Sequence, residues 1–260
     1  MKELKISIIM VSYNQGNMIE DSILSVLNQN YPYLEFILID GKSSDNTLKI
    51  IDKYKDRVDI IVTENDKGMY HARNKGIMLA TGDYIGFLNT DDLLFPNALN
   101  NIRKFIVDND FPDMLFGYTA FLNKDGIKSE KVIFGKGVNI DKDVYFKTMK
   151  TIPDQSAFYK KESISFIGIY DTTLRFGADT DLKCRYIKRN MNICIYPEII
   201  AGWKVYEEAL TYRKDIKHER FKEALKVNHR YNRFYLNHYV IRLFFYNYIV
   251  PVVKRCISFK

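Results

Sequence analysis

Two adjacent carboxylates, Asp91 and Asp92, follow a short apolar run that ends at Leu88. Neighbouring like charges repel each other unless a cation or strong hydrogen-bond donors offset them. A hard divalent cation such as Mg²⁺ or Mn²⁺ would do so, because it takes one or two protein carboxylates together with phosphate oxygens. The pair therefore predicts a site for a metal ion and a phosphorylated ligand. The alternative for each carboxylate is an ordinary turn or helix cap.

Polar residues also follow two earlier apolar runs. Ser12-Tyr13-Asn14 comes after residues 6–11, and Asp40 comes after residues 36–39. Short continuous apolar runs are typical of parallel strands that are buried on both faces. Ligands bind beyond the carboxyl ends of the strands in an open parallel sheet, so these residues should meet the paired carboxylates at one edge.

The first hundred residues alternate between strand and helix patterns. Strands are expected at 6–11, 36–39, 58–62 and 84–88, and helices at 19–27, 45–54 and 70–80. This order predicts an α/β fold whose mostly parallel sheet is flanked by helices on both sides. Further elements are expected with a looser order: helices at 94–109 and 179–189, and strands at 114–123 and 193–196.

The net charge of +7 and the pI of about 9.0 suggest a polyanionic partner. The distribution of the charge weakens that interpretation. Glu223 is the last acidic residue, and seven basic residues follow it; without those seven, thirty-two basic residues balance thirty-two acidic ones. We therefore expect a neutral body at 1–223 and a basic, aromatic, helical tail at 224–260.

The tail has two possible explanations. A basic aromatic helix can lie on an anionic membrane surface, or it can pack on the body with its apolar face buried. The sequence contains no run of about 18 apolar residues, so no transmembrane helix is predicted. Three cysteines without metal-ligand spacing (Cys184, Cys194 and Cys256) fit a reducing compartment. We expect a cytoplasmic protein, with a peripheral position on the inner face of the plasma membrane as the alternative that the tail suggests.

The sequence has no Gly-rich P-loop and no GxGxxG after its first strand. These absences argue against a P-loop NTPase and against an ordinary dinucleotide-binding protein. Four ordered segments instead resemble the signature of inverting family 2 glycosyltransferases with the GT-A fold. They are ISIIMVSYN (6–14), ILIDGKSSDNT (37–47), NDKGMYHARNKGI (65–77) and TGDYIGFLNTDD (81–92). Two later segments, IPDQSAFYKKE (152–162) and YDTTLRFGADTDLKCRYI (170–187), are similar to the acceptor-side half of such enzymes.

The resemblance covers about residues 5–190 and implies a nucleotide-sugar-binding half at 1–100 and an acceptor-side half at 101–223. Asp40 matches the carboxylate that hydrogen-bonds the base or ribose of the donor, and Tyr13 lies where the first loop packs on the base. Asp91 and Asp92 match the DXD-like element, with Asp92 as the direct metal ligand. Asn89 stands where the family commonly has a further Asp.

Asp179 matches the catalytic base, which would take the proton of the acceptor hydroxyl as that oxygen attacks the sugar. The alternative is a helix N-cap, for which Asp181 is an equal candidate. Arg73 lies near where a diphosphate could bind, and its alternative is a solvated helix face. Asp154 and Gln155 are expected on the acceptor side, although many relatives carry His at the place of Asp154.

The resemblance implies metal-dependent, inverting transfer of a sugar from a nucleotide diphosphate, with Mn²⁺ or Mg²⁺ as cofactor. UDP is the expected donor nucleotide, and GDP or dTDP stays open. The acceptor would be a saccharide or a lipid-linked saccharide in bacterial surface polysaccharide synthesis.

Three alternative functions compete with this interpretation. A sugar nucleotidyltransferase would place a Gly-rich segment with Arg and Lys after the first strand, and residues 12–16 lack it. A non-catalytic nucleotide-sugar binder would not need all four carboxylates. A nucleic-acid binder could stack bases on the aromatic tail, but a neutral body with a paired-Asp site argues against a nucleic-acid partner.

Overall fold

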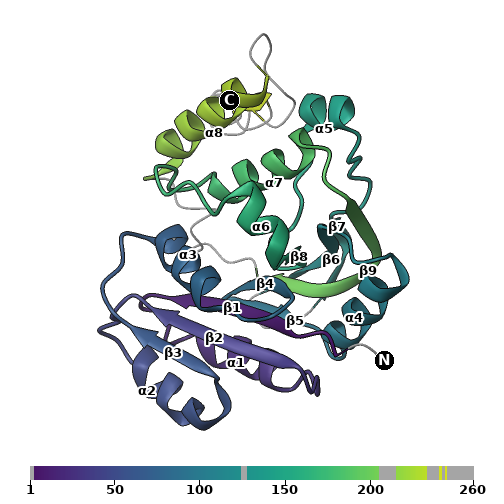
Figure 1. Ribbon diagram of the computed structural model, residues 1–260. Coiled ribbons are helices and arrows are strands. Elements are labelled where there is room, and N and C mark those ends of the chain that lie inside the picture. Colours follow the sequence, from purple (N-terminus) through teal and green to yellow (C-terminus); the bar gives the residue numbers. More distant parts are fainter. Residues whose placement is uncertain (1–2, 124–127, 205–214, 233–239, 242–243, 245–260) are drawn as a thin grey trace.

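The computed structural model describes residues 3–123, 128–204, 215–232, 240–241 and 244, which form an α/β fold around one curled sheet (Figure 1). Four strands run parallel in the order β3-β2-β1-β4. They are β1 (Ile6–Ser12), β2 (Leu34–Asp40), β3 (Ile60–Thr63) and β4 (Tyr84–Asn89). The strands expected in the first hundred residues are thus confirmed, and so is their parallel direction.

The second half of the sheet is mixed. Its strands are β5 (Asp92–Leu94), β6 (Met114–Leu122), β7 (Lys128–Phe134), β8 (Ala157–Lys160) and β9 (Ile193–Lys204). Strand β8 runs antiparallel to both β4 and β6, whereas β6 and β9 are parallel. Strands β5 and β7 pair antiparallel to β9 and β6. The expectation of a mostly parallel sheet therefore holds for the first half, and the second half adds antiparallel pairs.

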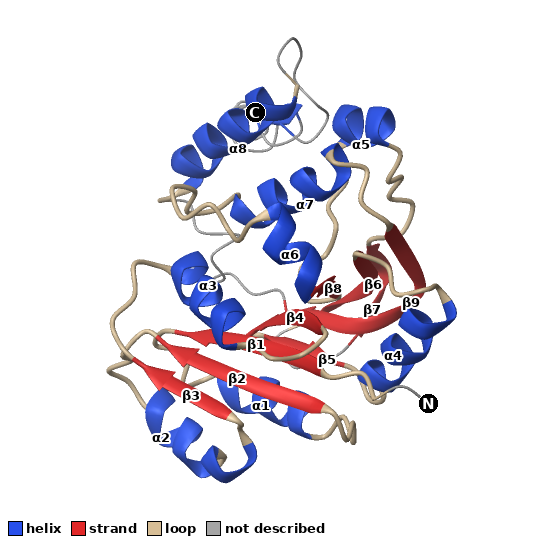
Figure 2. Cartoon of the chain, viewed as in Figure 1, coloured by secondary structure: helices blue, strands red, loops and turns tan. Residues whose placement is uncertain are grey.

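Helices cover both faces of the sheet, as the sequence predicted (Figure 2). One face carries α1 (Ile19–Leu27), α2 (Thr47–Lys53) and α4 (Ala98–Asp108). The other carries α3 (Met69–Leu79), α5 (Lys142–Thr148), α6 (Lys161–Ile167) and α7 (Ala178–Lys188). The chain also has the short 3-10 helix η1 (Lys55–Arg57) and the helix α8 (Lys217–Tyr231).

Strand β1 explains why both faces are apolar. Successive side chains of a strand point to opposite faces, so Ile8 and Met10 pack with α1 and α4 while Ile9 packs with α3. Helix α3 lies close to β1 at Gly76, where a Cβ atom would come within 2.5 Å of Cγ2 of Ile9. This close packing brings the first turn of α3 to the carboxyl ends of the strands.

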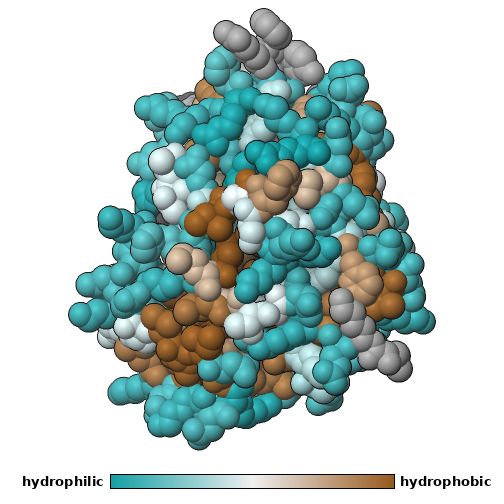
Figure 3. Space-filling view, viewed as in Figure 1, coloured by the Kyte–Doolittle hydropathy of each residue, from teal (hydrophilic) through white to brown (hydrophobic). Residues whose placement is uncertain are grey.

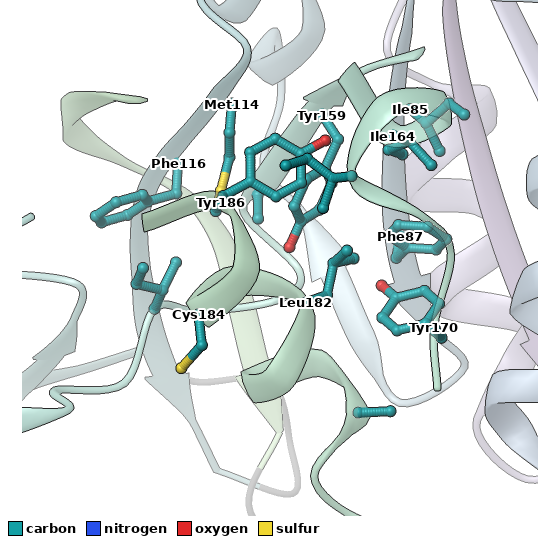
Figure 4. Close-up of a cluster of buried hydrophobic side chains, with 14 of the residues drawn as sticks. Ile85, Phe87, Met114, Phe116, Tyr159, Ile164, Tyr170, Leu182, Cys184 and Tyr186 are labelled. Atoms are coloured by element: carbon teal, nitrogen blue, oxygen red, sulfur yellow. The ribbon is translucent and has the colours of Figure 1, made fainter. Parts of the chain in front are cut away.

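Helix α7 is held on the second half of the sheet by a buried cluster (Figure 4). Leu182 and Tyr186 of α7 lie against Met114, Phe116 and Tyr159 in this cluster. The rings of Tyr159 and Tyr186 meet edge to face, with centroids 5.5 Å apart. This packing fixes the place of the first turn of α7, which carries Asp179.

Helix α8 continues across the expected boundary between residues 223 and 224. It docks on the loop that leads into α7 through Glu223, whose carboxylate accepts hydrogen bonds from the backbone N–H groups of Arg175, Phe176 and Gly177. Most of the predicted basic aromatic tail lies outside the described residues. Within the described part, no helix is long and apolar enough to span a bilayer. Hydrophilic residues cover most of the face in Figure 3, with apolar patches over part of the sheet.

Candidate active site

The carboxyl ends of three strands bring the predicted polar residues to one edge of the sheet. Strand register pairs Ser12 with Asp40 and Val11 with Asn89. The loop after β1, the end of β2 and the end of β4 therefore lie side by side. The convergence that the sequence predicted is present in the fold.

Asp40 is fully buried and serves the loops around it. Its carboxylate accepts hydrogen bonds from Oγ of Ser12 at 2.6 Å and from the backbone and side chain of Ser43 at 2.7 Å each. Tyr13, by contrast, is 61% exposed. Its ring lies beside Gly41, where a Cβ atom would be 3.2 Å from Cδ2 of the tyrosine. The edge thus presents a free aromatic surface on an ordered loop.

The paired carboxylates differ in environment. Asp92 is fully buried, and Oδ2 of its carboxylate accepts a hydrogen bond of 2.9 Å from Nδ2 of Asn89, whereas Oδ1 has no hydrogen-bond partner. Burial and the neighbouring charge of Asp91 raise the pKa of Asp92 well above its usual range. A buried carboxylate oxygen without a partner fits a cation ligand, since buried polar atoms are normally paired.

The ligands of such a cation would have to come partly from the substrate. Among the described residues, no group of three His, Cys, Asp or Glu side chains is arranged to hold a metal ion. Mg²⁺ and Mn²⁺ are commonly held by one or two carboxylates plus substrate phosphates. The residues present therefore fit a metal that binds together with a diphosphate.

Arg73 is only 3% exposed, so the alternative of a solvated helix face is wrong. Its guanidinium lies 5.2–5.7 Å from the ring centroids of Tyr70, Phe87 and Tyr170. One arm of its fork donates to Oδ1 of Asn89 at 2.8 Å, and another pairs with Asp154. The arginine therefore connects the paired-carboxylate strand end to the loop before β8.

Asp179 lies on the first turn of α7 with its side chain 26% exposed. The hydroxyl of Tyr70 donates to Oδ1 of Asp179 at 3.0 Å, and burial raises the pKa of this tyrosine well above its usual range, so it stays a donor. Nζ of Lys183 lies 3.4 Å from Oδ2 of Asp179 and 2.9 Å from Oδ1 of Asp154. These contacts join the base candidate to the Arg73 network.

The cap alternatives for α7 are wrong. Gly177 occupies the N-cap position, and no side chain caps the helix there. Asp181 is buried and pairs instead with Arg185 at 3.0 Å and with Arg230 of α8 at 2.5 Å. Asp179 therefore does not cap the helix, and its part-exposed side chain contacts Tyr70 and Lys183 instead.

Sequence reasoning missed two members of the site, Tyr70 and Lys183. Helical spacing offered a signal for both, since Lys183 follows Asp179 by four positions and Tyr70 precedes Arg73 by three. The structure places Asp154 in the network with 13% of its side chain exposed, and the next residue, Gln155, is buried. The predicted donor-side, metal and base residues all lie along this one edge or network.

Comparisons with known proteins identify the family of the chain. The model of the family described as glycosyl transferase family 2 matches residues 7–165. TuaG, a glycosyltransferase of Bacillus subtilis named for teichuronic acid biosynthesis, is 33% identical over 131 residues, or 49% of this chain and 52% of TuaG. A Mycobacterium bovis glycosyltransferase named for PGL/p-HBAD biosynthesis is 28% identical over 200 residues, or 75% of each chain. The match thus spans about half the length of TuaG.

Solved structures share the fold at low sequence identity. Staphylococcus aureus TarS 1-349 in complex with UDP superposes with a TM-score of 0.62 at 19% identity, covering 85% of this chain and 66% of that one. The mannosyltransferase PcManGT from Pyrobaculum calidifontis, in complex with GDP-Man and Mn²⁺, gives 0.61 at 19% identity over 86% of this chain and 65% of that one. These likenesses show the GT-A fold. Because the family model covers more than half of the sequence, the chain belongs to glycosyl transferase family 2.

Proposed function

We propose that the chain transfers a sugar from a nucleotide diphosphate sugar to a saccharide hydroxyl, with inversion and with Mn²⁺ or Mg²⁺. One observation carries the proposal: Asp92 and Asp179 stand at the two ends of a single series of contacts through Asn89, Arg73, Asp154 and Lys183. The network thus positions the proposed metal and diphosphate site at Asp92 relative to the proposed base, Asp179. Such fixed positioning suits a displacement at C1 of the sugar between them.

Asp179 acts as the general base. Inverting transfer needs one carboxylate to take the proton of the acceptor hydroxyl as its oxygen attacks C1 of the sugar. The hydroxyl of Tyr70 donates to Oδ1 of Asp179, and the carboxylate remains 26% exposed. Asp92, with Asp91 beside it, would hold the metal, which when bound stabilises negative charge on the departing diphosphate.

The donor nucleotide lies on the β1 and β2 loops. Asp40 orders these loops through Ser12 and Ser43, and the exposed ring of Tyr13 offers a stacking surface for the base. Solved relatives in the same fold hold UDP or GDP-Man, and we propose UDP as the nucleotide here. Arg73, buried behind this edge, orients the diphosphate end through Asn89.

The acceptor would be a saccharide or lipid-linked saccharide of a bacterial surface polymer, which the names of the relatives support. In the proposed division, residues 1–100 bind the donor, and residues 101–223, including Asp154 and Gln155, form the acceptor side. The basic tail at 224–260 would bring a cytoplasmic protein to an anionic membrane surface.

The test has two stages. A thermal-shift screen of nucleotide diphosphates with and without Mn²⁺ identifies the donor base, since bound ligand stabilises the folded chain by mass action. Transfer from the matching nucleotide sugar is then measured for wild type, Asp92→Ala and Asp179→Asn. We expect Asp92→Ala to lose the metal-dependent shift and transfer, and Asp179→Asn to lose transfer alone. Full turnover by either variant would remove its assignment, and metal-dependent binding without transfer by wild type would favour a non-catalytic binder.

A further inference from the structure

Asp154 is the shared counter-ion of two buried cations. Arg73 is 3% exposed and the side chain of Lys183 is 2% exposed, and the carboxylate of Asp154 contacts both. Burial opposes its charge, yet Lys183 and Arg73 hold the pKa of Asp154 at about 2. A buried cation without a counter-ion is strongly unfavourable, so the two cations depend on this carboxylate.

Lys183 divides its ammonium group among three oxygens. Nζ donates to the backbone oxygen of Ile152 at 3.0 Å and lies 2.9 Å from Oδ1 of Asp154. Its third contact, to Oδ2 of Asp179, is the longest of the three at 3.4 Å. The ammonium is therefore closer to Asp154, with which it forms an ion pair, than to Asp179, to which it donates a long hydrogen bond.

The long contact leaves Asp179 usable as a base. Its Oδ1 accepts from Tyr70 at 3.0 Å, whereas Oδ2 accepts only the long hydrogen bond of 3.4 Å from Lys183, so Oδ2 is the more weakly held oxygen and the one more available to an incoming hydroxyl. Without the charge of Asp154, Asp179 would be the remaining carboxylate within 4.0 Å of Lys183 among the ion pairs of the described residues. The ammonium would then close on Oδ2, because a buried cation moves toward its nearest counter-ion. The strengthened contact with Lys183 would then compete with the acceptor hydroxyl for Oδ2.

We propose that Asp154 is a positioning residue that keeps Lys183 closer to itself than to Asp179, so that Oδ2 of the base stays weakly held and available to the acceptor hydroxyl. The inference rests on the proposed function of Asp179. Asp154 still lies in the proposed acceptor-side half, but its side chain is bound by two cations and only 13% exposed, so we propose that it acts through Lys183 and not by touching the acceptor.

A structural test does not depend on activity. Crystal structures of wild type and Asp154→Asn are compared at Lys183. We expect the contact between Nζ of Lys183 and Oδ2 of Asp179 to shorten from 3.4 Å to ordinary hydrogen-bond length in the variant. A lysine that keeps its place overturns the proposal, even if the wild type transfers no sugar; absent transfer by wild type counts against the proposed function alone.

A kinetic test separates positioning from acceptor binding. For Asp154→Asn we expect kcat to fall by about tenfold or more with the acceptor KM near wild type, because only the base is obstructed. The double variant Asp154→Asn/Lys183→Met removes the obstructing ammonium and should regain most of that loss. The matched control Asp171→Asn, which loses a carboxylate paired with Arg230 outside the site, should behave as wild type.

Two results would overturn the proposal. One is a raised acceptor KM with unchanged kcat in Asp154→Asn, which is what a direct acceptor contact predicts. The other is additive loss in the double variant, since independent sites add. If Asp154→Asn does not fold, the kinetic test uses the double variant, which loses one charge of each sign. We expect its kcat to be within about tenfold of the wild-type value. A loss of about a hundredfold or more refutes the proposal.

Discussion

Arg73 donates a hydrogen bond of 2.8 Å to the side-chain oxygen of Asn89, and this contact joins α3 to the strand end that precedes the paired carboxylates. Nδ2 of Asn89 donates in turn to Asp92 at 2.9 Å. An amide has both an acceptor and donors, so it can stand between a guanidinium and a carboxylate. A carboxylate at position 89 would offer Asp92 no donor.

Arg73→Lys tests whether the guanidinium fork itself is required. Lysine keeps the charge, but its single ammonium cannot reproduce the fork that reaches Asn89 and Asp154 together. A lost hydrogen bond to a charged group is worth roughly 1.5–3 kcal/mol, so we expect kcat/KM for transfer to fall by about tenfold to a hundredfold. The control Arg57→Lys changes an exposed arginine that donates to the backbone of Leu27 and should leave transfer intact. Equal activity in both variants would show that charge alone suffices at position 73.

The positions of Asp40, Asp91 and Asp92 could be predicted because each follows an apolar run that forms a buried parallel strand. The local pattern is enough to predict these strands, since continuous apolar runs of this length are typical of parallel strands that are buried on both faces. The burial of Arg73 could not be predicted in this way. Its surroundings come from Phe87 and Tyr170, which lie far away in sequence, so its own helix pattern holds no sign of them.

Two strands show what local pattern leaves out. Strand β5 is three residues long and exists only through pairing with β9, so Asp92 and Leu94 gave no strand signal. Strand β9 was expected at 193–196 but continues to Lys204. A proline is disfavoured inside a paired strand because it cannot donate a backbone hydrogen bond. The pairing of β9 with β6 shifts register near Pro197, and this irregularity accommodates the proline.

Arg230→Ala should destabilise the fold because Arg230 ties α8 to α7. The arginine donates to buried Asp181 at 2.5 Å and to Asp171 at 3.0 Å. Hydrogen bonds to charged groups contribute roughly 1.5–3 kcal/mol, and Arg185 still pairs with Asp181, so we expect a loss of about 2 kcal/mol in the free energy of unfolding. Urea denaturation measures the loss. Arg189→Ala, at a position that stacks on the exposed Phe166, should cost less than about 0.5 kcal/mol, and similar costs for both variants would contradict the tie.

Glu35 makes a pH-dependent contribution to the stability of the fold. It lies at the amino end of β2, opposite the strand end that carries Asp40. Burial favours its neutral form, but hydrogen bonds from Lys5, Ser7 and Thr81 hold the pKa of Glu35 at about 2. A lowered pKa in the folded chain stabilises it above the unfolded pKa of about 4.3, and this contribution is lost as the pH falls toward 2.

Glu35→Gln should therefore be most destabilising, relative to wild type, at pH 5–7. The difference in unfolding free energy should shrink at pH 3 and approach its minimum near pH 2, which denaturation series at each pH would measure. Glu162→Gln is the control, because Glu162 is 84% exposed and forms a surface pair of 3.5 Å with Lys160. A destabilisation by Glu35→Gln that does not change with pH would show that packing, and not charge, matters at this position.

The proposed membrane role of the tail calls for a truncation that spares α8. A cut near residue 224 would remove Arg230 and also Tyr231, which stacks on Phe146 with centroids 5.5 Å apart, so loss of binding would be confused with loss of fold. A chain ending at Asn232 keeps these contacts and loses five of the seven basic residues that follow Glu223. Each basic residue near an anionic surface contributes about 1 kcal/mol, so binding to phosphatidylserine vesicles should fall by more than a hundredfold at low salt. Sedimentation with neutral and anionic vesicles measures this, and undiminished binding of the shortened chain to anionic vesicles would show that the tail is not the membrane-binding segment.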